Sequence, residues 1–209
     1  MTKSKKKDAI AEVALKLFNE RGYDNVSLRE IADEADTTIG NLTYHFPQKE
    51  DLIFSIQNRF QTDYLDDVPM ELENGHDTLE TIVMLFKKGQ KNLDSNTFYF
   101  SNLVELSKNH KVIMDASHEF RLKLFHLYQT LLKKLVEYGM MRSEIREEQY
   151  EILSITLVTL SSFWIQNTSP YYDADLPSFN LFTANINMIY PYLTEMGIEI
   201  LKTYLDKIN

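Results

Sequence analysis

The chain has 209 residues, 44% of them hydrophobic, and a formal net charge of −9 at neutral pH. The absence of cysteine excludes a disulfide framework and a thiolate metal site. No apolar run approaches the roughly 18 residues that a membrane-spanning helix needs. The start holds lysines but no continuous apolar segment typical of a signal peptide, so we expect a cytoplasmic protein without a membrane partner.

The negative charge is unevenly placed along the chain. Residues 1–60 hold nine Lys or Arg and ten Asp or Glu, so most of the acidic excess lies in the remainder. Four lysines fall within the first seven positions, at Lys3, Lys5, Lys6 and Lys7. Local basicity counts for more than the total charge in contacts with phosphate, so a nucleic-acid partner is not excluded.

The first predicted helix follows from apolar residues at one-face helical spacing, which run from Ile10 to Phe18. Gly22 is expected to end it, with Tyr23 folded back onto its last turn. Ser27 and Glu30 have the spacing of a capping box, which predicts the start of a second helix.

A third, short helix is predicted from Thr38, a good N-cap residue, to the break at Pro47. Leu42 and Phe46 would point toward the other helices, whereas Gly40, Asn41, Tyr44 and His45 would share the opposite side. That side is polar but uncharged at its centre, which suits base edges and phosphate oxygens. Glycine there permits close approach to a groove, and the helix N-terminus at Thr38 offers free N–H groups to an anion.

Two short helices joined by a tight break have the outline of a helix-turn-helix. A longer helix is predicted from about Gln48, with Lys49 placed to reach a phosphate. Further helical patterns cover residues 77–94, 97–108, 110–138, 146–168 and 178–206. Residues 169–177 read as a loop, and Pro191 should kink or restart the last helix. The prediction is an all-α chain of about nine helices.

Residues 10–53 resemble the N-terminal DNA-binding domain of the tetracycline-repressor (TetR) family. The matching positions are Leu17-Phe18, Gly22-Tyr23, Ile31-Ala32, Ala35, Gly40, Leu42, His45-Phe46, Lys49 and Leu52. The resemblance implies a helix-turn-helix DNA-binding domain over residues 1–47. It implies a helical effector-binding and dimerisation bundle over residues 48–209.

The resemblance also implies roles for single residues. Tyr44 and His45 would grip phosphates, and Arg29 matches a position that often touches DNA. Ile39 stands where a base-reading residue often lies, so a thymine-methyl contact and a core role are both open. The full set expected to bind DNA is Arg29, Thr38, Ile39, Gly40, Asn41, Thr43, Tyr44, His45 and Lys49. Asp36-Thr37 departs from the usual Gly-Val of the turn, and Thr43 stands where the family often has tyrosine.

For the larger domain the resemblance implies a homodimer through the C-terminal helices and an unknown apolar or aromatic small-molecule effector. Aromatic residues that could line its pocket are Phe98, Tyr99, Phe120, Tyr128, Phe163 and Trp164, although each could equally be core. The aliphatic stripe of Ile152, Ile155, Leu157 and Leu160 fits either a core or a dimer interface.

Enzyme functions find little support, and no cofactor is expected. The six glycines are too scattered for a phosphate-binding loop. Two carboxylate-x-x-His pairs, Glu73–His76 and Asp115–His118, leave a helical di-metal enzyme as one alternative. The other alternative is a coactivator or interaction protein that keeps the TetR fold without sequence-specific DNA binding. We predict a transcriptional regulator that represses from a palindromic operator and is released by an effector.

Overall fold

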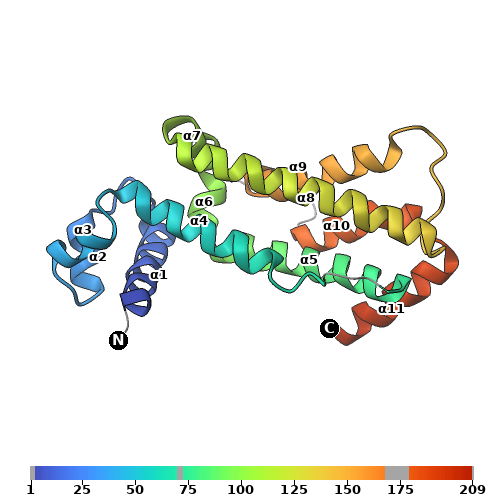
Figure 1. Cartoon of the computed structure of the whole chain (residues 1–209), viewed down its shortest axis with the longest axis horizontal. Helices are drawn as coiled ribbons and strands as arrows, with labels where there is room; N and C mark the ends of the chain where they lie inside the picture. The colour runs from blue at the N-terminus through green and yellow to red at the C-terminus, as the bar shows by residue number, and fades with distance from the viewer. Residues whose placement is uncertain (1–2, 70–72, 168–178, 209) are drawn as a thin grey trace. The chain divides into compact units, whose positions relative to one another are not determined.

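The computed structural model of the chain describes residues 3–69, 73–167 and 179–208. All regular secondary structure in these ranges is helical, which confirms the predicted all-α class (Figure 1). The elements are α1 (Lys3–Arg21), α2 (Leu28–Glu34), α3 (Ile39–His45), α4 (Lys49–Leu65), α5 (Gly75–Ser95), α6 (Thr97–Ser101), α7 (Leu103–Asn109), α8 (Lys111–Glu137), α9 (Gln149–Asn167), α10 (Leu181–Ile189), the 3₁₀ helix η1 (Tyr190–Tyr192) and α11 (Glu195–Ile208). None of the helices in these ranges has both the length and the apolarity to cross a bilayer.

The described ranges hold eleven α-helices where the sequence predicted about nine, because two predicted segments divide. Residues 97–108 form α6 and α7, which meet at Asn102, whose φ of −112° and ψ of 11° interrupt the helix. The last segment divides into α10, η1 and α11 around Pro191, where a kink or restart was predicted. The predicted loop at 169–177 lies outside the described residues.

The chain separates into two compact units. The first comprises residues 1–63 and 94–118, and the second comprises residues 64–93 and 119–209. The three N-terminal helices therefore share a compact unit with most of α4 and with α6 and α7. The functional boundary predicted after residue 47 stays a prediction, because compactness does not show which part acts alone.

In the first unit aromatic side chains of α6 pack against aromatic side chains of α1 and α4. The Phe18 ring on α1 lies 5.2 Å from the Phe98 ring on α6, and the Phe60 ring on α4 lies 5.0 Å from the Tyr99 ring, centroid to centroid. Leu52, Ile53 and Ile56 of α4 are also buried. A three-helix segment alone would have a marginal core, and these contacts extend it.

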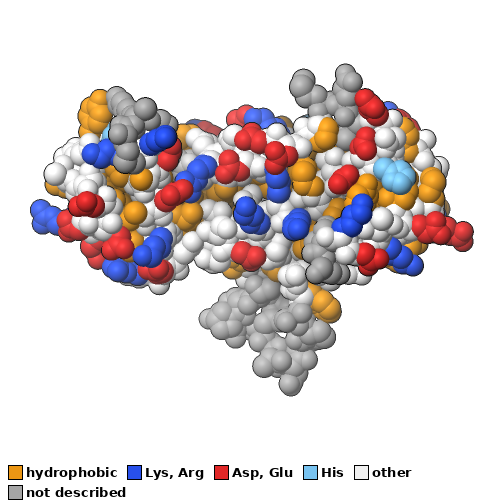
Figure 2. All heavy atoms as spheres, turned by 90° about the horizontal axis from the view of Figure 1, so that it is seen from below, with side chains coloured by type: hydrophobic (Ala, Val, Ile, Leu, Met, Phe, Trp, Pro, Cys, Tyr) orange, Lys and Arg blue, Asp and Glu red, His pale blue; other side chains and the backbone are white. Residues whose placement is uncertain are grey.

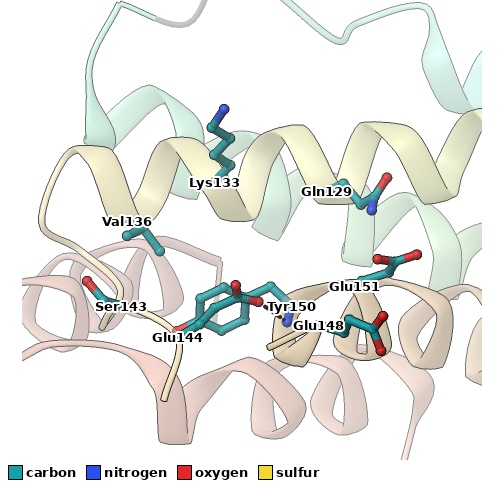
Figure 3. Close-up of a pocket in the computed structure, with 8 residues that line it drawn as sticks. All are labelled: Gln129, Lys133, Val136, Ser143, Glu144, Glu148, Tyr150 and Glu151. Atoms are coloured by element: carbon teal, nitrogen blue, oxygen red, sulfur yellow. Dashed lines mark hydrogen bonds between the residues drawn. The ribbon is translucent and has the colours of Figure 1, made fainter. Parts of the chain in front are cut away.

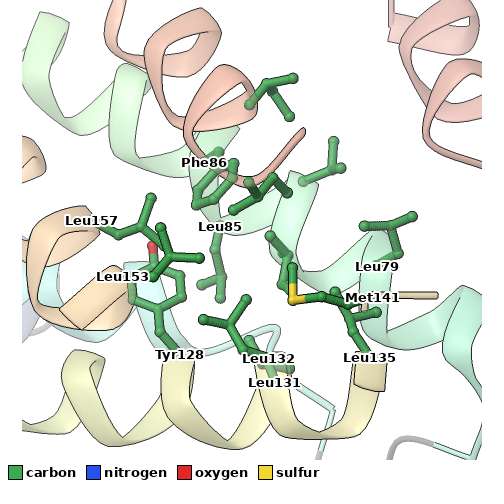
Figure 4. Close-up of a cluster of buried hydrophobic side chains, with 14 of the residues drawn as sticks. Leu79, Leu85, Phe86, Tyr128, Leu131, Leu132, Leu135, Met141, Leu153 and Leu157 are labelled. Carbon is green, nitrogen blue, oxygen red and sulfur yellow. The ribbon is translucent and has the colours of Figure 1, made fainter. Parts of the chain in front are cut away.

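The second unit has a continuous apolar core formed by α5, α8, α9, α10 and α11. Figure 4 shows Leu79 and Phe86 of α5, Tyr128 and Leu132 of α8, and Leu157 of α9 converging on one interior. At this apolar spacing each helix contributes one stripe, and burial of the stripes is the main stabilising term.

Candidate nucleic-acid interface

Helix α1 ends at the glycine that the sequence indicated. Gly22 has a φ of +80°, a left-handed conformation that glycine adopts without steric cost. The Tyr23 ring then lies 5.4 Å from the Phe18 ring in an edge-to-face contact. Burial raises the pKa of the Tyr23 hydroxyl to about 12. The predicted fold-back of Tyr23 is therefore confirmed, and it sets the direction from which the chain enters α2.

Helix α2 begins at the predicted capping box. The Ser27 hydroxyl accepts from the Glu30 backbone N–H at 3.2 Å, and the Ser27 backbone N–H donates to Glu30 Oε2 at 2.8 Å. The bonds from Ser27 lower the pKa of the Glu30 carboxyl. Arg29, one of the predicted DNA contacts, is exposed in this first turn.

The turn between α2 and α3 forms despite the absence of glycine. Asp36 has a φ of 46°, in the left-handed region. The Thr37 N–H donates to the Ala32 carbonyl at 3.0 Å, and the Asp36 N–H donates to the Asp33 carbonyl at 3.2 Å. These two bonds make a Schellman motif, in which the left-handed position is usually glycine. Aspartate tolerates that conformation better than most residues, so the departure from the family pattern leaves the turn intact.

Helix α3 starts at Thr38, whose side chain accepts from the Asn41 backbone N–H at 3.2 Å, as predicted for an N-cap. Leu42 is fully buried, whereas the Tyr44 side chain is 67% exposed. A Cβ atom added to Gly40 would meet no other atom within 4 Å. The helix therefore buries one side and leaves open the side that holds Gly40 and Tyr44.

Two polar side chains of α3 are bonded within the turn and the helix. Asn41 Nδ2 donates to Thr37 Oγ1 at 2.8 Å, which fixes the amide near the turn. The Thr43 hydroxyl donates to the Ile39 carbonyl at 2.9 Å. Because a phosphate only accepts hydrogen bonds, Thr43 must release this bond before it can donate to DNA. The DNA contacts of Asn41 and Thr43 stay predictions.

Lys49 is held against α1 and the α1–α2 connection. Its ammonium donates to the Tyr23 carbonyl and lies 4.1 Å from the Tyr23 ring centroid. Burial lowers the pKa of the Lys49 ammonium. An ammonium has three donors, so the Tyr23 bond leaves capacity for a phosphate, and the predicted phosphate contact stays a prediction.

The remaining predicted contacts lie close to the open side of α3. Ile39 is exposed at the first position of the helix, so its side chain is outside the core. The His45 ring is partly exposed and lies 5.2 Å from the Tyr44 ring. Lys5, Lys6 and Lys7 are exposed near the start of α1, and Lys7 Nζ lies 5.3 Å from the Phe46 ring at the end of α3. Positive charge therefore lies beside α3 in spite of the negative total.

No single sign of charge dominates the face that Figure 2 shows, where lysine and arginine alternate with aspartate and glutamate. Among the described residues no three His, Asp or Glu side chains gather as a metal site would require. Asp115, from one of the carboxylate–histidine pairs, instead forms an ion pair with Lys111 at 2.7 Å.

The six aromatic residues predicted to line a pocket are divided between the two units. Phe98 and Tyr99 are buried in the first unit, whereas the other four belong to the second. A depression of about 420 Å³ lies between α8 and the start of α9 (Figure 3), lined by Gln129, Lys133, Val136, Ser143, Glu144, Glu148, Tyr150 and Glu151. Its three carboxylates make it a poor site for an apolar effector.

A second depression, of about 530 Å³, lies between α9 and the α10–η1 segment. Its lining residues are Ile145, Arg146, Glu147, Gln149, Ile152, Leu153, Thr156, Met188 and Tyr192. None of the six predicted aromatics lines either depression, and their role at an effector stays a prediction.

The arrangement of α1 to α4 matches that of a known family of regulators. Residues 10–56 match the model of the bacterial regulatory proteins, tetR family. The N-terminal segment of the chain is therefore that of the tetR family of bacterial regulatory proteins. The match covers α2, α3 and the start of α4 completely, so the open side of α3 belongs to this family's DNA-binding segment.

Similarity to curated relatives and solved structures extends beyond this segment. The chain is 27% identical over 152 residues to the HTH-type transcriptional repressor KstR2 of Rhodococcus jostii, covering 70% of the chain and 72% of KstR2. Its matches to several other curated HTH-type regulators span less than two thirds of those proteins.

Two solved structures share the fold over nearly the whole chain. A TetR-family regulator from Marinobacter aquaeolei superposes with a TM-score of 0.79 at 23% identity, covering 99% of this chain and 98% of that one. AibR, solved with isovaleryl coenzyme A and operator DNA, superposes with a TM-score of 0.61 at 16% identity, over 90% and 99%. At these identities the similarity establishes the fold.

Asn19 and Asn185 are two buried or bridging residues that the sequence did not single out. Asn19 on α1 donates from Nδ2 to the Ser95 carbonyl at 2.8 Å and accepts from the Phe98 N–H at 3.1 Å. Asn185 is buried in α10. The partners of Asn19 lie more than 70 positions away in the sequence, so no local signal could have identified its role. The signal for the burial of Asn185 was its helical spacing of four residues from the apolar Leu181 and Ile189.

Proposed function

We propose that the protein is a transcriptional repressor that binds a palindromic operator as a homodimer and leaves it when a small molecule binds the larger helical domain. The observation that carries the proposal is the open side of α3, where a Cβ atom added to Gly40 would meet nothing beyond its own helix within 4 Å and Tyr44 is largely exposed. A helix with such a side can lie in a major groove with its backbone close to the bases. Buried Leu42 anchors the opposite side.

The repressive mode is supported by analogy. KstR2 is named a repressor, and AibR was solved with both an operator and an acyl coenzyme A. A regulator of this kind needs an effector that binds one dimer geometry better than the other. A coupling free energy of about 1–3 kcal/mol would change DNA affinity roughly 5–150-fold.

Dimerisation is supported by apolar side chains left exposed on α9. Ile152 is 59% exposed and Ile155 is 47% exposed, whereas Leu157 of the same predicted stripe is fully buried. Ile152 also lines the depression that Met188 shares. The sequence could not separate core from interface along this stripe, but the burial pattern assigns Ile152 and Ile155 to the surface. We assign them to a two-fold contact.

The dimer contact can be tested by charge substitution. The double variant Ile152→Glu, Ile155→Glu should sediment as a monomer where the wild type sediments as a dimer. Val112→Glu is a matched control, because Val112 is also an exposed apolar residue on a helix. Dimers of unchanged stability in the double variant would place the interface elsewhere.

The operator is tested by selection of bound sequences from random duplex DNA with the full chain. Two recognition helices of a dimer should select half-sites roughly 34–36 Å apart, centre to centre, in a palindrome. Failure to enrich any palindrome would favour the coactivator or interaction protein instead.

The proposed phosphate contact of Tyr44 is tested with Tyr44→Phe, which removes one hydroxyl donor. Binding to the selected operator and to random DNA should weaken by a similar factor, because phosphate contacts carry no sequence information. Tyr204→Phe is the control, since the Tyr204 hydroxyl bonds to the His76 carbonyl within the second unit. Unchanged affinity for both DNAs would remove Tyr44 from the interface.

A further inference from the structure

Helix α10 carries an asparagine whose polar atoms are buried without protein partners. Asn185 is 1% exposed, and among the described residues neither Oδ1 nor Nδ2 has a hydrogen-bond partner. Leaving both atoms unpaired costs free energy that an apolar residue would avoid. An effector that supplies the missing bonds would give this residue a function.

The neighbours of α10 define where Asn185 points. Leu181 and Ile189, four residues before and after it, are buried on the same side of the helix. The Leu181 side chain lies 3.9 Å from the position of a Cβ atom on Gly89, so this side of α10 faces α5. Asn185 therefore points toward α5.

The direction of the helices gives the level of Asn185 along the core. The Phe182 N–H donates to Gln90 Oε1 at 3.3 Å near the end of α5, whereas Gly75 at its start and Gly197 on α11 both lie against Met140. The segment from α10 to α11 therefore runs antiparallel to α5, which places Asn185 near the level of Leu85 and Phe86.

Helix α9 also contacts α10. The Tyr150 and Tyr192 rings lie 5.8 Å apart, so α10 and η1 also run antiparallel to α9. Asn185 then falls near the level of Leu157. Figure 4 shows Leu157, Phe86, Leu85 and Tyr128 converging from α9, α5 and α8.

The polar groups at this level are uncharged. The Tyr64 hydroxyl donates to the Leu85 carbonyl at 2.8 Å and lies 3.1 Å from the Tyr128 hydroxyl. Since Tyr64 gives its hydrogen to Leu85, Tyr128 donates to Tyr64, and the Tyr128 oxygen keeps acceptor capacity. No Lys, Arg, His, Asp or Glu side chain is buried among the residues that the structure describes. A charged ligand would find no buried countercharge here.

A break in α9 lies further along the same helix. Phe163 has a φ of −121° and a ψ of 18°, which kinks the helix about two turns beyond Leu157. Residues near this sparsely populated region of backbone conformation cluster at ligand sites. Phe163 was also among the aromatics expected near an effector.

We propose that Asn185 is the polar anchor of an effector site in the second unit, and that the effector is an uncharged, mainly apolar molecule carrying a carboxamide. A carboxamide presents a donor and an acceptor side by side, which matches Nδ2 and Oδ1 of Asn185 in a paired hydrogen bond. Leu85, Phe86 and Leu157 contact its apolar part. This proposal rests on the proposed function and specifies the chemistry of its effector.

The test uses three probes of similar shape, namely benzamide, benzoate and toluene, with the full-length protein. Wild type should bind benzamide saturably, measured by calorimetry or ligand-observed NMR, and should bind benzoate more weakly. Asn185→Leu keeps the branched shape of the side chain and removes the polar atoms. It should bind benzamide at least about tenfold more weakly and toluene equally well.

A matched variant controls for effects on folding. Ser154 is buried like Asn185, but its hydroxyl donates to the Tyr150 carbonyl at 2.7 Å. Ser154→Ala should lower the unfolding temperature, whereas Asn185→Leu should leave it unchanged or raise it. If the leucine variant does not fold, Asn185→Ser gives the same comparison of benzamide affinities.

The proposal is overturned if wild type does not bind benzamide, or if the Asn185 variants bind it as tightly as wild type. A measurement of operator binding distinguishes failure of this effector site from failure of the proposed function. Wild type that binds operator DNA but not benzamide would overturn this effector site alone, whereas wild type that binds no DNA would overturn the proposed function.

Discussion

Asp36 shows how a single residue can depart from a family pattern without loss of the local structure. Its φ of 46° is costly for a residue with a side chain, yet the Schellman bonds of the turn hold it there. The cost is tolerated because the turn aligns α3 with α2.

Asp36→Gly should raise the free energy of unfolding by about 0.5–1 kcal/mol, because glycine adopts this conformation without a steric penalty and loses only part of the gain through greater chain entropy. Urea denaturation measures the change. Asp33→Gly, in the helical part of α2, is the opposite control and should lower the free energy of unfolding by about 0.3 kcal/mol. A lower stability for Asp36→Gly would show that the Asp36 side chain itself stabilises the turn.

Asn19 acts at the scale of elements, because it caps a helix to which it does not belong. The N-cap residue of α6, Asn96, forms no side-chain capping bond. Instead Asn19 Oδ1 accepts from the Phe98 N–H at 3.1 Å and from the Thr97 hydroxyl at 3.0 Å. This cap joins α1, within the DNA-binding segment, to α6.

Asn19→Ala should lower the free energy of unfolding by about 1–2 kcal/mol, the usual cost of a lost cap. Hydrogen exchange at the Phe98 amide should become faster as well. Asn25→Ala is the control, because Asn25 forms one local bond, to the Arg21 carbonyl, and its removal should cost less. Equal effects of the two substitutions would deny the cap a role in joining the helices.

The elements show what the sequence could and could not predict. Helix ends marked by neighbouring residues, such as Gly22, Ser27 and Thr38, were predicted because their signals act over three or four positions. The break at Asn102 carries no proline or glycine and was missed. The bond from Lys49 to Tyr23 joins residues 26 positions apart, and no local pattern encodes it.

Across the molecule, several tyrosine hydroxyls have a higher pKa in the folded protein than in the unfolded chain. Burial raises the pKa of Tyr128 to about 12 and the pKa of Tyr64 above its ordinary value. Tyr23 is affected in the same direction. A raised pKa adds stability below the unfolded value of 10.0, and this stability is lost as the pH rises toward 12.

The urea midpoint should therefore fall as the pH is raised from about 10 to 12. Lys49 acts in the opposite direction, since its lowered pKa favours the folded state at higher pH, but it is one partly buried group against several tyrosines. Tyr128→Phe should make the fall shallower. A midpoint that stays constant up to pH 12 would contradict the burial of these hydroxyls.

The central claim is that the open side of α3 lies in a DNA groove, and Gly40→Leu tests it most directly. Because nothing lies within 4 Å of a Cβ atom at Gly40, the variant should keep the unfolding temperature of the wild type or exceed it. Its affinity for the selected operator, measured at one fixed salt concentration, should fall at least about tenfold, because the side chain would occupy the space of the DNA. Operator affinity equal to that of the wild type in this folded variant would contradict the account.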